Sequence, residues 1–163
     1  MKTIILFRHG KSDWNKIYGL DHDRPIAKRG INAAKLMGIY LREKKNIPDC
    51  VISSTALRAK STAQLAIDSG DWNQELTLEK KLYGASPETI FEIIREQNNV
   101  YKSICLVGHE PSMSSFIYKY TNASYLRFPT ATMARIDFET NDWKYLDKSL
   151  VTLCWIKRPK ELY

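Results

Sequence analysis

The chain alternates short apolar segments, rich in β-branched residues, with longer segments whose apolar residues recur at helical spacing. This alternation is typical of strands joined by crossover helices, which build a largely parallel sheet covered on both faces. The expected strands are residues 3–7, 49–53, 103–107, 133–138 and 151–156. The expected helices are residues 28–44, 57–69, 87–97 and 111–120. We therefore expect an α/β fold, a three-layer α/β/α sandwich with a mostly parallel central sheet.

The length and the charge of the chain limit the classes of protein to consider. A chain of 163 residues without repeats or linkers predicts a single domain over residues 1–163. The net charge of +7 favours acidic or phosphorylated partners. Nucleic acid is not expected as a partner, because the sequence has neither a dense block of lysine and arginine nor zinc-finger spacing.

The cysteines and the apolar runs predict where the protein acts. Three cysteines, Cys50, Cys105 and Cys154, form no C-x-x-C pair, and each lies in an apolar context. We interpret them as buried thiols in a reducing compartment. No apolar run is long enough for a signal peptide or a membrane span. The expectation is a cytoplasmic protein with no membrane partner.

Basic side chains follow three of the expected strands. Arg8 and His9 come after the first strand, Arg58 follows the second after a short turn, and His109 follows the third. Because ligands of such folds gather beyond the carboxyl ends of the strands, we expect these four side chains to meet at one edge of the sheet. The turn at Ser53 and Ser54 is expected to shape this edge.

Two arginines and two histidines at one point require an anion, and a phosphoryl dianion fits best. Arginine makes bidentate hydrogen bonds to phosphate oxygens. A neutral imidazole nitrogen is a good nucleophile, and its attack on phosphorus gives a phosphohistidine that water then hydrolyses. The arginines would stabilise charge in the transition state, so neither a metal ion nor another cofactor is expected.

Three sequence motifs resemble those of the histidine phosphatase superfamily. They are RHGKSDW at residues 8–14, SSTALRAKSTAQLA at residues 53–66 and CLVGHEPSM at residues 105–113. Together with LYGASPETIFEII at residues 82–94, they are most similar to the small SixA-like phosphohistidine phosphatases. That sub-group usually has alanine after the histidine, whereas this chain has Gly10.

The resemblance implies a phosphoglycerate mutase-like fold and a role for each matched residue. His9 becomes the nucleophile, and Arg8, Arg58 and His109 become the phosphate pocket. Asn15 matches a phosphate contact in part of the superfamily. The implied activity is hydrolysis of a phosphorylated protein, on phosphohistidine, or of a small phosphorylated substrate.

The superfamily's usual proton donor has no clear counterpart. It is a glutamate within L-x-E-R-x-Y-G, and the matching segment, LEKKLYG, has Lys80 there, with Glu79 one residue earlier. Alternative donors are the acids of the polar loop, Asp21 and Asp23, and Glu110. Asp23 is equally well explained as a turn residue, and Glu110 as an acid at a helix N-terminus.

A weak acid favours substrates with an easy leaving group. The imidazole of phosphohistidine can leave already carrying a proton, whereas an alkoxide needs a proton donor. Protein phosphohistidine is therefore the preferred substrate. A phosphatase of small phosphate esters and a non-catalytic module that binds phosphoproteins stay open. Lys157, Arg158 and Lys160 are interpreted as a solvated surface, or alternatively as a surface that helps an acidic partner dock.

Overall fold

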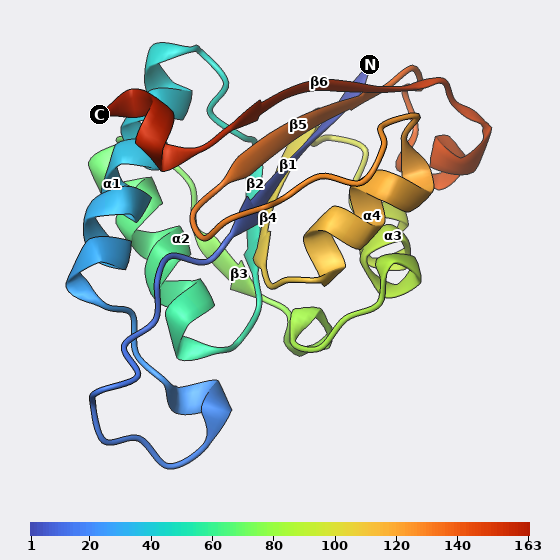
Figure 1. The fold of residues 1–163 in the computed structure, drawn as a ribbon. Coiled ribbons are helices and arrows are strands. Elements are labelled where there is room, and N and C mark those ends of the chain that lie inside the picture. The colour runs from blue at the N-terminus through green and yellow to red at the C-terminus, as the bar shows by residue number, and fades with distance from the viewer.

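The computed structural model describes residues 1–163 and contains one six-stranded sheet with the strand order β3-β2-β4-β1-β5-β6 (Figure 1). The strands are β1 (Lys2–Arg8), β2 (Cys50–Ser53), β3 (Leu76–Leu78), β4 (Ser103–Gly108), β5 (Met133–Phe138) and β6 (Val151–Lys157). The helices are α1 (Lys28–Glu43), α2 (Leu57–Ser69), α3 (Pro87–Arg95) and α4 (Ser112–Tyr120). The first four strands in this order are parallel, and β5 and β6 are antiparallel to their neighbours.

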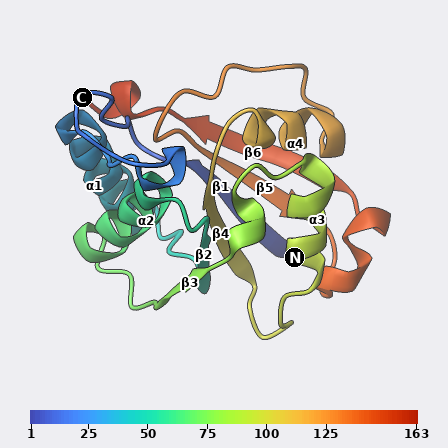
Figure 2. The ribbon, with the colours of Figure 1, turned by 90° about the horizontal axis from the view of Figure 1, so that it is seen from below.

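Two helices cover each face of the sheet, so the predicted three-layer sandwich is confirmed. Figures 1 and 2 show α1 and α2 on one side of the sheet and α3 and α4 on the other. Strand β1 shows why. Ile4 and Leu6 face the core under α3 and α4, whereas Ile5 and Phe7 face the core under α1 and α2. Since successive side chains of a strand point to opposite faces, an uninterrupted apolar strand needs a cover on both sides.

The sequence did not predict β3. It is an edge strand of three residues, partly exposed, that pairs only with β2. Such a segment is too short and too polar to show a strand pattern. Four short 3₁₀ helices, which lack a clear periodicity, were not predicted either: Asp21–Asp23, Lys80–Leu82, Trp143–Lys148 and Pro159–Leu162.

The burial of the cysteines differs from the expectation. Cys105 is buried, but Cys50 is only partly buried and Cys154 is exposed, so the prediction of three buried thiols is wrong. Cys154 lies on the edge strand β6, whose side chains are only partly covered. All three are free thiols. None of the helices is long and apolar enough to cross a membrane.

The segment after β1 packs tightly against the first turn of α1. The Ala27 N–H donates to the Lys11 carbonyl at 2.8 Å. Gly10 and Gly30 touch backbone to backbone: a Cβ on Gly10 would lie 2.7 Å from the Gly30 carbonyl oxygen, and a Cβ on Gly30 would lie 2.4 Å from the Lys11 carbonyl oxygen. This contact fixes the position of the chain that follows Arg8.

A Gly30→Ala substitution tests that contact. Alanine favours helix by roughly 1 kcal/mol over glycine, but here its methyl group would push the Lys11 backbone away. We expect a net loss of about 1–3 kcal/mol in the free energy of unfolding, as for an overpacked core. Urea denaturation measures it. Gly19→Ala is the control, because a Cβ there meets nothing within 4 Å; equal effects of the two substitutions would contradict the contact.

Candidate active site

The parallel register brings three strand ends to one edge of the sheet. Arg8, the last residue of β1, pairs with Gly108, the last residue of β4. The His9 N–H donates to the Gly108 carbonyl at 3.0 Å, and the Ser54 N–H donates to the Val107 carbonyl at 2.9 Å. The carboxyl ends of β1, β4 and β2 are therefore side by side, as ligand sites in such folds require.

A cleft of about 550 Å³ opens at this edge. It contains all four side chains that the sequence predicted to converge: Arg8, His9, Arg58 and His109. The rings of His9 and His109 have centroids 5.2 Å apart. The other lining residues are Lys11, Ser12, Trp14, Arg24, Tyr83, Gly84, Glu110 and Thr130. Glu110 supplies the only carboxylate of the lining, so the cleft is strongly cationic.

Hydrogen bonding sets the tautomer of His9. Its Nδ1 lies 2.7 Å from the carbonyl oxygen of Gly10. Because a carbonyl only accepts, Nδ1 carries the proton and Nε2 keeps its lone pair. Gly10 is held in turn by Thr62, whose Oγ1 accepts from the Gly10 N–H at 2.9 Å and donates to the Arg58 carbonyl at 2.7 Å.

Burial keeps both cleft histidines neutral. His9 is 6% exposed and His109 is 7% exposed. Burial lowers the pKa of His9 to about 3 although the Gly10 hydrogen bond raises it, and the nearby His109, Arg58 and Arg8 lower it as well. Burial, followed by the charge of Arg58, lowers the pKa of His109 to about 4. At neutral pH, His9 therefore presents an unprotonated Nε2.

Three buried nitrogen atoms of the cleft residues have no hydrogen-bond partner. They are Nε of Arg8, Nε of Arg58 and Nδ1 of His109. Each guanidinium is otherwise anchored: Arg8 donates from Nη1 to the Phe128 carbonyl at 2.9 Å, and Arg58 donates to the backbone carbonyl and the carboxylate of Asp21.

Asp21 connects three side chains that line the cleft. Its carboxylate accepts from Arg58 at 3.0 Å, from Arg24 at 2.6 Å and from the Tyr83 hydroxyl at 2.5 Å. The hydrogen bond from Tyr83, followed by that from Arg58, lowers the pKa of Asp21 to about 2. Asp21 is therefore ionised at neutral pH and has no proton to donate.

Of the remaining candidates, the structure brings only Glu110 together with the four. Asn15 is exposed and its backbone N–H donates to the Asp13 carboxylate, while the Asp23 side chain is 62% exposed and lies 3.7 Å from His22. Neither lines the cleft. Glu110 does, but both of its carboxylate oxygens accept from Ser114, at 2.7 Å each, in the first turn of α4. The roles of these three residues stay predictions.

Arg24 and Tyr83 line the cleft but were not predicted as site residues, although the sequence carries a partial signal for them. Arg24 is buried, stacks over the Trp14 ring at 3.6 Å and donates to Ser12 at 3.0 Å. Tyr83 reaches the cleft because the chain turns at Gly84, which has φ +71°. The Tyr-Gly pair was visible in the motif, but only the fold shows that the tyrosine meets Asp21.

Glu79 and Lys80, at the position of the superfamily's usual proton donor, are outside the cleft. The Glu79 carboxylate accepts from the Lys81 N–H and caps a 3₁₀ helix. No group of three or more His, Cys, Asp or Glu side chains is placed to hold a metal ion. Metal independence stays a prediction.

Comparisons with known proteins match the motifs and the fold. The sequence model of the histidine phosphatase superfamily (branch 1) matches residues 4–85, about half of the chain. An uncharacterised protein of Mycobacterium tuberculosis is 40% identical over 109 residues, which are 66% of this chain. The match spans 65% of that protein's own length.

Solved structures share the whole fold at low sequence identity. The protein histidine phosphatase SixA complexed with tungstate superposes with a TM-score of 0.86 at 19% identity, over 99% of each chain. A mutant phosphoserine phosphatase of Entamoeba histolytica in complex with phosphoserine gives a TM-score of 0.72 at 16% identity, over 100% of each chain. The fold is thus SixA-like. Because the sequence match covers the RHG and S-S-x-x-L-R segments, the chain belongs to the histidine phosphatase superfamily, branch 1.

Proposed function

We propose that the protein is a phosphatase that works through a covalent phosphohistidine on Nε2 of His9. The observation that carries the proposal is a neutral His9 with a free Nε2 in a cleft that Arg8, Arg58 and His109 also line. Arg8 and Arg58 would donate to phosphoryl oxygens from the Nη N–H groups that their bonds to Phe128 and Asp21 leave free. Tungstate bound by a SixA protein of the same fold supports an oxyanion as ligand.

The reaction would proceed in two displacements. His9 Nε2 forms a bond to phosphorus while the bond from phosphorus to the leaving group breaks, and the leaving group departs with a proton. Water then attacks phosphorus, the bond to Nε2 breaks, and inorganic phosphate leaves. The guanidinium groups stabilise the charge on the equatorial oxygens in both steps. Since the arginines provide this charge, the mechanism needs no metal ion.

The favoured substrate is phosphohistidine in a protein. Asp21 is ionised, the Glu110 oxygens are engaged by Ser114, and Glu79 lies outside the cleft, so no side chain is poised as a strong proton donor. An imidazole leaving group tolerates this arrangement. A site for small phosphate esters is the second candidate, because the phosphoserine phosphatase of Entamoeba histolytica has a similar fold.

The free thiols support a reducing, cytoplasmic location.

The His9→Ala variant tests the nucleophile. We expect turnover of a phosphohistidine peptide to fall by about 10³-fold or more, since removing a nucleophile leaves only binding and charge stabilisation. Quenched wild-type enzyme should carry one phosphoryl group on the peptide that contains His9, detected by mass spectrometry. His22→Ala is the matched control, because His22 bonds Thr55 outside the cleft. A phosphoryl group on another residue would refute the mechanism.

A substrate panel tests the leaving-group argument. The value of kcat/KM for a phosphohistidine peptide should exceed that for an alkyl phosphate by about 10²-fold or more, the usual contribution of a general acid. Steady-state phosphate release measures both. Comparable values would show that a proton donor acts in the cleft and would favour the ester-phosphatase alternative.

The protonation of His9 also predicts how stability depends on pH. The unfolded imidazole binds a proton below about pH 6.5, whereas folded His9 does so only near pH 3. The unfolded state therefore gains protons first, and the free energy of unfolding falls as pH drops from 6.5. His9→Asn should remove up to about 1.4 kcal/mol per pH unit of that slope. Urea titrations between pH 7 and 4.5 measure it, and identical slopes would contradict a neutral, buried His9.

A further inference from the structure

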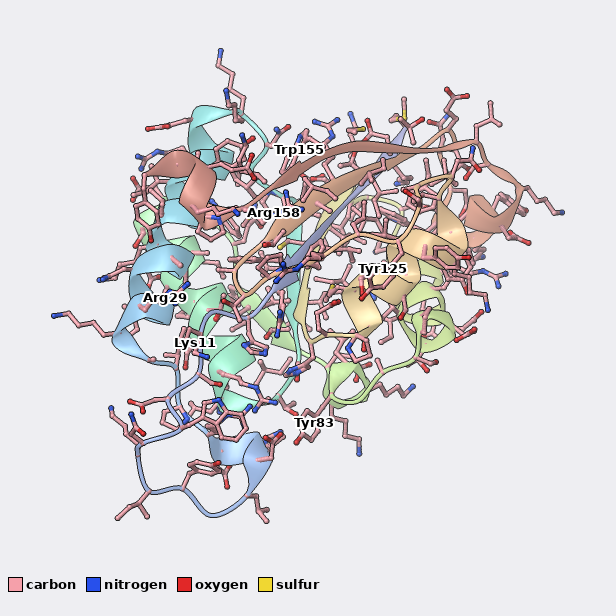
Figure 3. All side chains as sticks on the ribbon, viewed as in Figure 1. Lys11, Arg29, Tyr83, Tyr125, Trp155 and Arg158 are labelled. Atoms are coloured by element: carbon pink, nitrogen blue, oxygen red, sulfur yellow. The ribbon has the colours of Figure 1, made fainter.

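A second cavity adjoins the catalytic cleft. It has a volume of about 260 Å³ and shares Lys11 and Thr130 with the cleft. Its charged lining residues are Lys11, Arg29, Arg158 and Lys160. We call this cavity, defined by those four residues, the flanking cavity. Figure 3 shows Lys11 and Arg29 beside α1, and Arg158 farther from Lys11, toward the C-terminal segment.

The flanking cavity has positive charge that the protein itself leaves unpaired. No ion pair within 4.0 Å and no side-chain hydrogen bond involves Lys11, Arg29 or Lys160, and no aspartate or glutamate lines the cavity. Only Arg158 has an acidic neighbour, Glu161, at 3.7 Å. By contrast, a cavity of about 370 Å³ at Arg8, Tyr125 and Arg127 includes the carboxylate of Glu110.

The cations come from parts of the chain that only the fold brings together. Lys11 follows the catalytic loop, and its carbonyl accepts from the first turn of α1. Arg29 lies in that turn, next to Gly30. Arg158 precedes the last 3₁₀ helix, where its N–H donates to Glu161 at 2.9 Å and its Nη2 donates to the Arg127 carbonyl at 3.2 Å. The positions of these backbones are therefore defined, although the side chains reach into solvent.

The chemistry of the lining suits a carboxylate on a short aliphatic stem. Ala33, Pro129 and Pro159 supply apolar wall between the charged groups. Exposed ion pairs are individually weak, so several cations around one cavity are needed to select an acidic segment. An extended peptide advances about 3.3 Å per residue, which places side chains near a phosphohistidine within reach of an adjoining cavity.

We propose that the flanking cavity binds acidic side chains next to the phosphohistidine of the protein substrate. The proposal rests on the proposed function, since it assumes that the phosphoryl group is held at His9. Part of the net charge of +7 would then determine substrate specificity. The cations beside the catalytic cleft would favour phosphorylated proteins that have acidic residues next to the phosphohistidine.

The test compares two phosphohistidine peptides that differ only in having glutamates or glutamines on both sides of the phosphohistidine. Wild-type enzyme should prefer the glutamate peptide in kcat/KM. In the double variant Arg29→Gln, Lys160→Gln this preference should fall by roughly three- to tenfold, the loss of two exposed ion pairs. The ratio of the two peptides is the readout, so a general change in activity cancels.

The matched control removes the same charge elsewhere. Lys35→Gln with Lys148→Gln replaces two exposed lysines that line neither cavity. This control should keep the wild-type preference. An equal loss of preference in the control would mean that only the overall positive field matters, and it would overturn the proposal.

Binding in the His9→Ala background separates this proposal from the proposed function. Fluorescence anisotropy gives Kd for both peptides, with and without the Arg29→Gln and Lys160→Gln substitutions. If the glutamate peptide binds more tightly and these substitutions abolish the difference in Kd, the flanking cavity is supported. An absence of turnover by the wild-type enzyme would then count only against the proposed function. Equal Kd values for the two peptides would overturn the proposal.

A second phosphoryl group is the competing occupant. If the double variant leaves the peptide ratio unchanged but weakens binding of fructose 1,6-bisphosphate relative to fructose 6-phosphate, the cavity accepts a second phosphate of a small molecule. The proposal would then be wrong.

Discussion

The parallel register of β1 and β2 on either side of β4 is the constraint on which the site depends. It aligns three strand ends, so that residues far apart in the sequence, Arg8, Ser54 and His109, become neighbours. The backbone hydrogen bonds from His9 to Gly108 and from Ser54 to Val107 extend the alignment of the strands by one residue. A slip of one residue would turn every side chain to the other face. The histidine pair would then be lost together with both apolar cores.

The electrostatics of the cleft follow from this arrangement. Two arginines and two imidazoles lie in one small space, and burial together with the arginines disfavours a charge on either imidazole. The concentration of positive charge that would bind the phosphoryl dianion of the proposed substrate thus also disfavours a proton on His9. Asp21 balances part of the charge from outside the cleft, where it orients Arg58 without supplying a proton.

The sequence predicted the sandwich and the four central residues because their signals are local. Apolar runs mark the strands, and Arg8, His9 and His109 lie within two residues of the end of such a run. What it could not predict depends on contacts between distant segments. Tyr83 becomes a cleft residue only because its hydroxyl meets Asp21. Glu110, by contrast, agrees with its interpretation as an acid at a helix N-terminus, since its carboxylate accepts from Ser114 in the first turn of α4. The glycine after His9 has a role that the sequence alone does not show, because Gly10 packs on the backbone of Gly30.

That glycine contact has a consequence for how the protein can vary. The carbonyl that fixes the tautomer of His9 belongs to Gly10, and Gly10 lies directly on the backbone of α1. Any side chain at residue 10 must therefore be accompanied by a shift of the helix, and the shift of the helix carries Arg29 with it. A substitution at residue 10 would consequently change both the hydrogen bond to His9 and the position of the charge at Arg29. A relative that kept His9 but replaced this glycine would have to change the neighbouring surface at the same time.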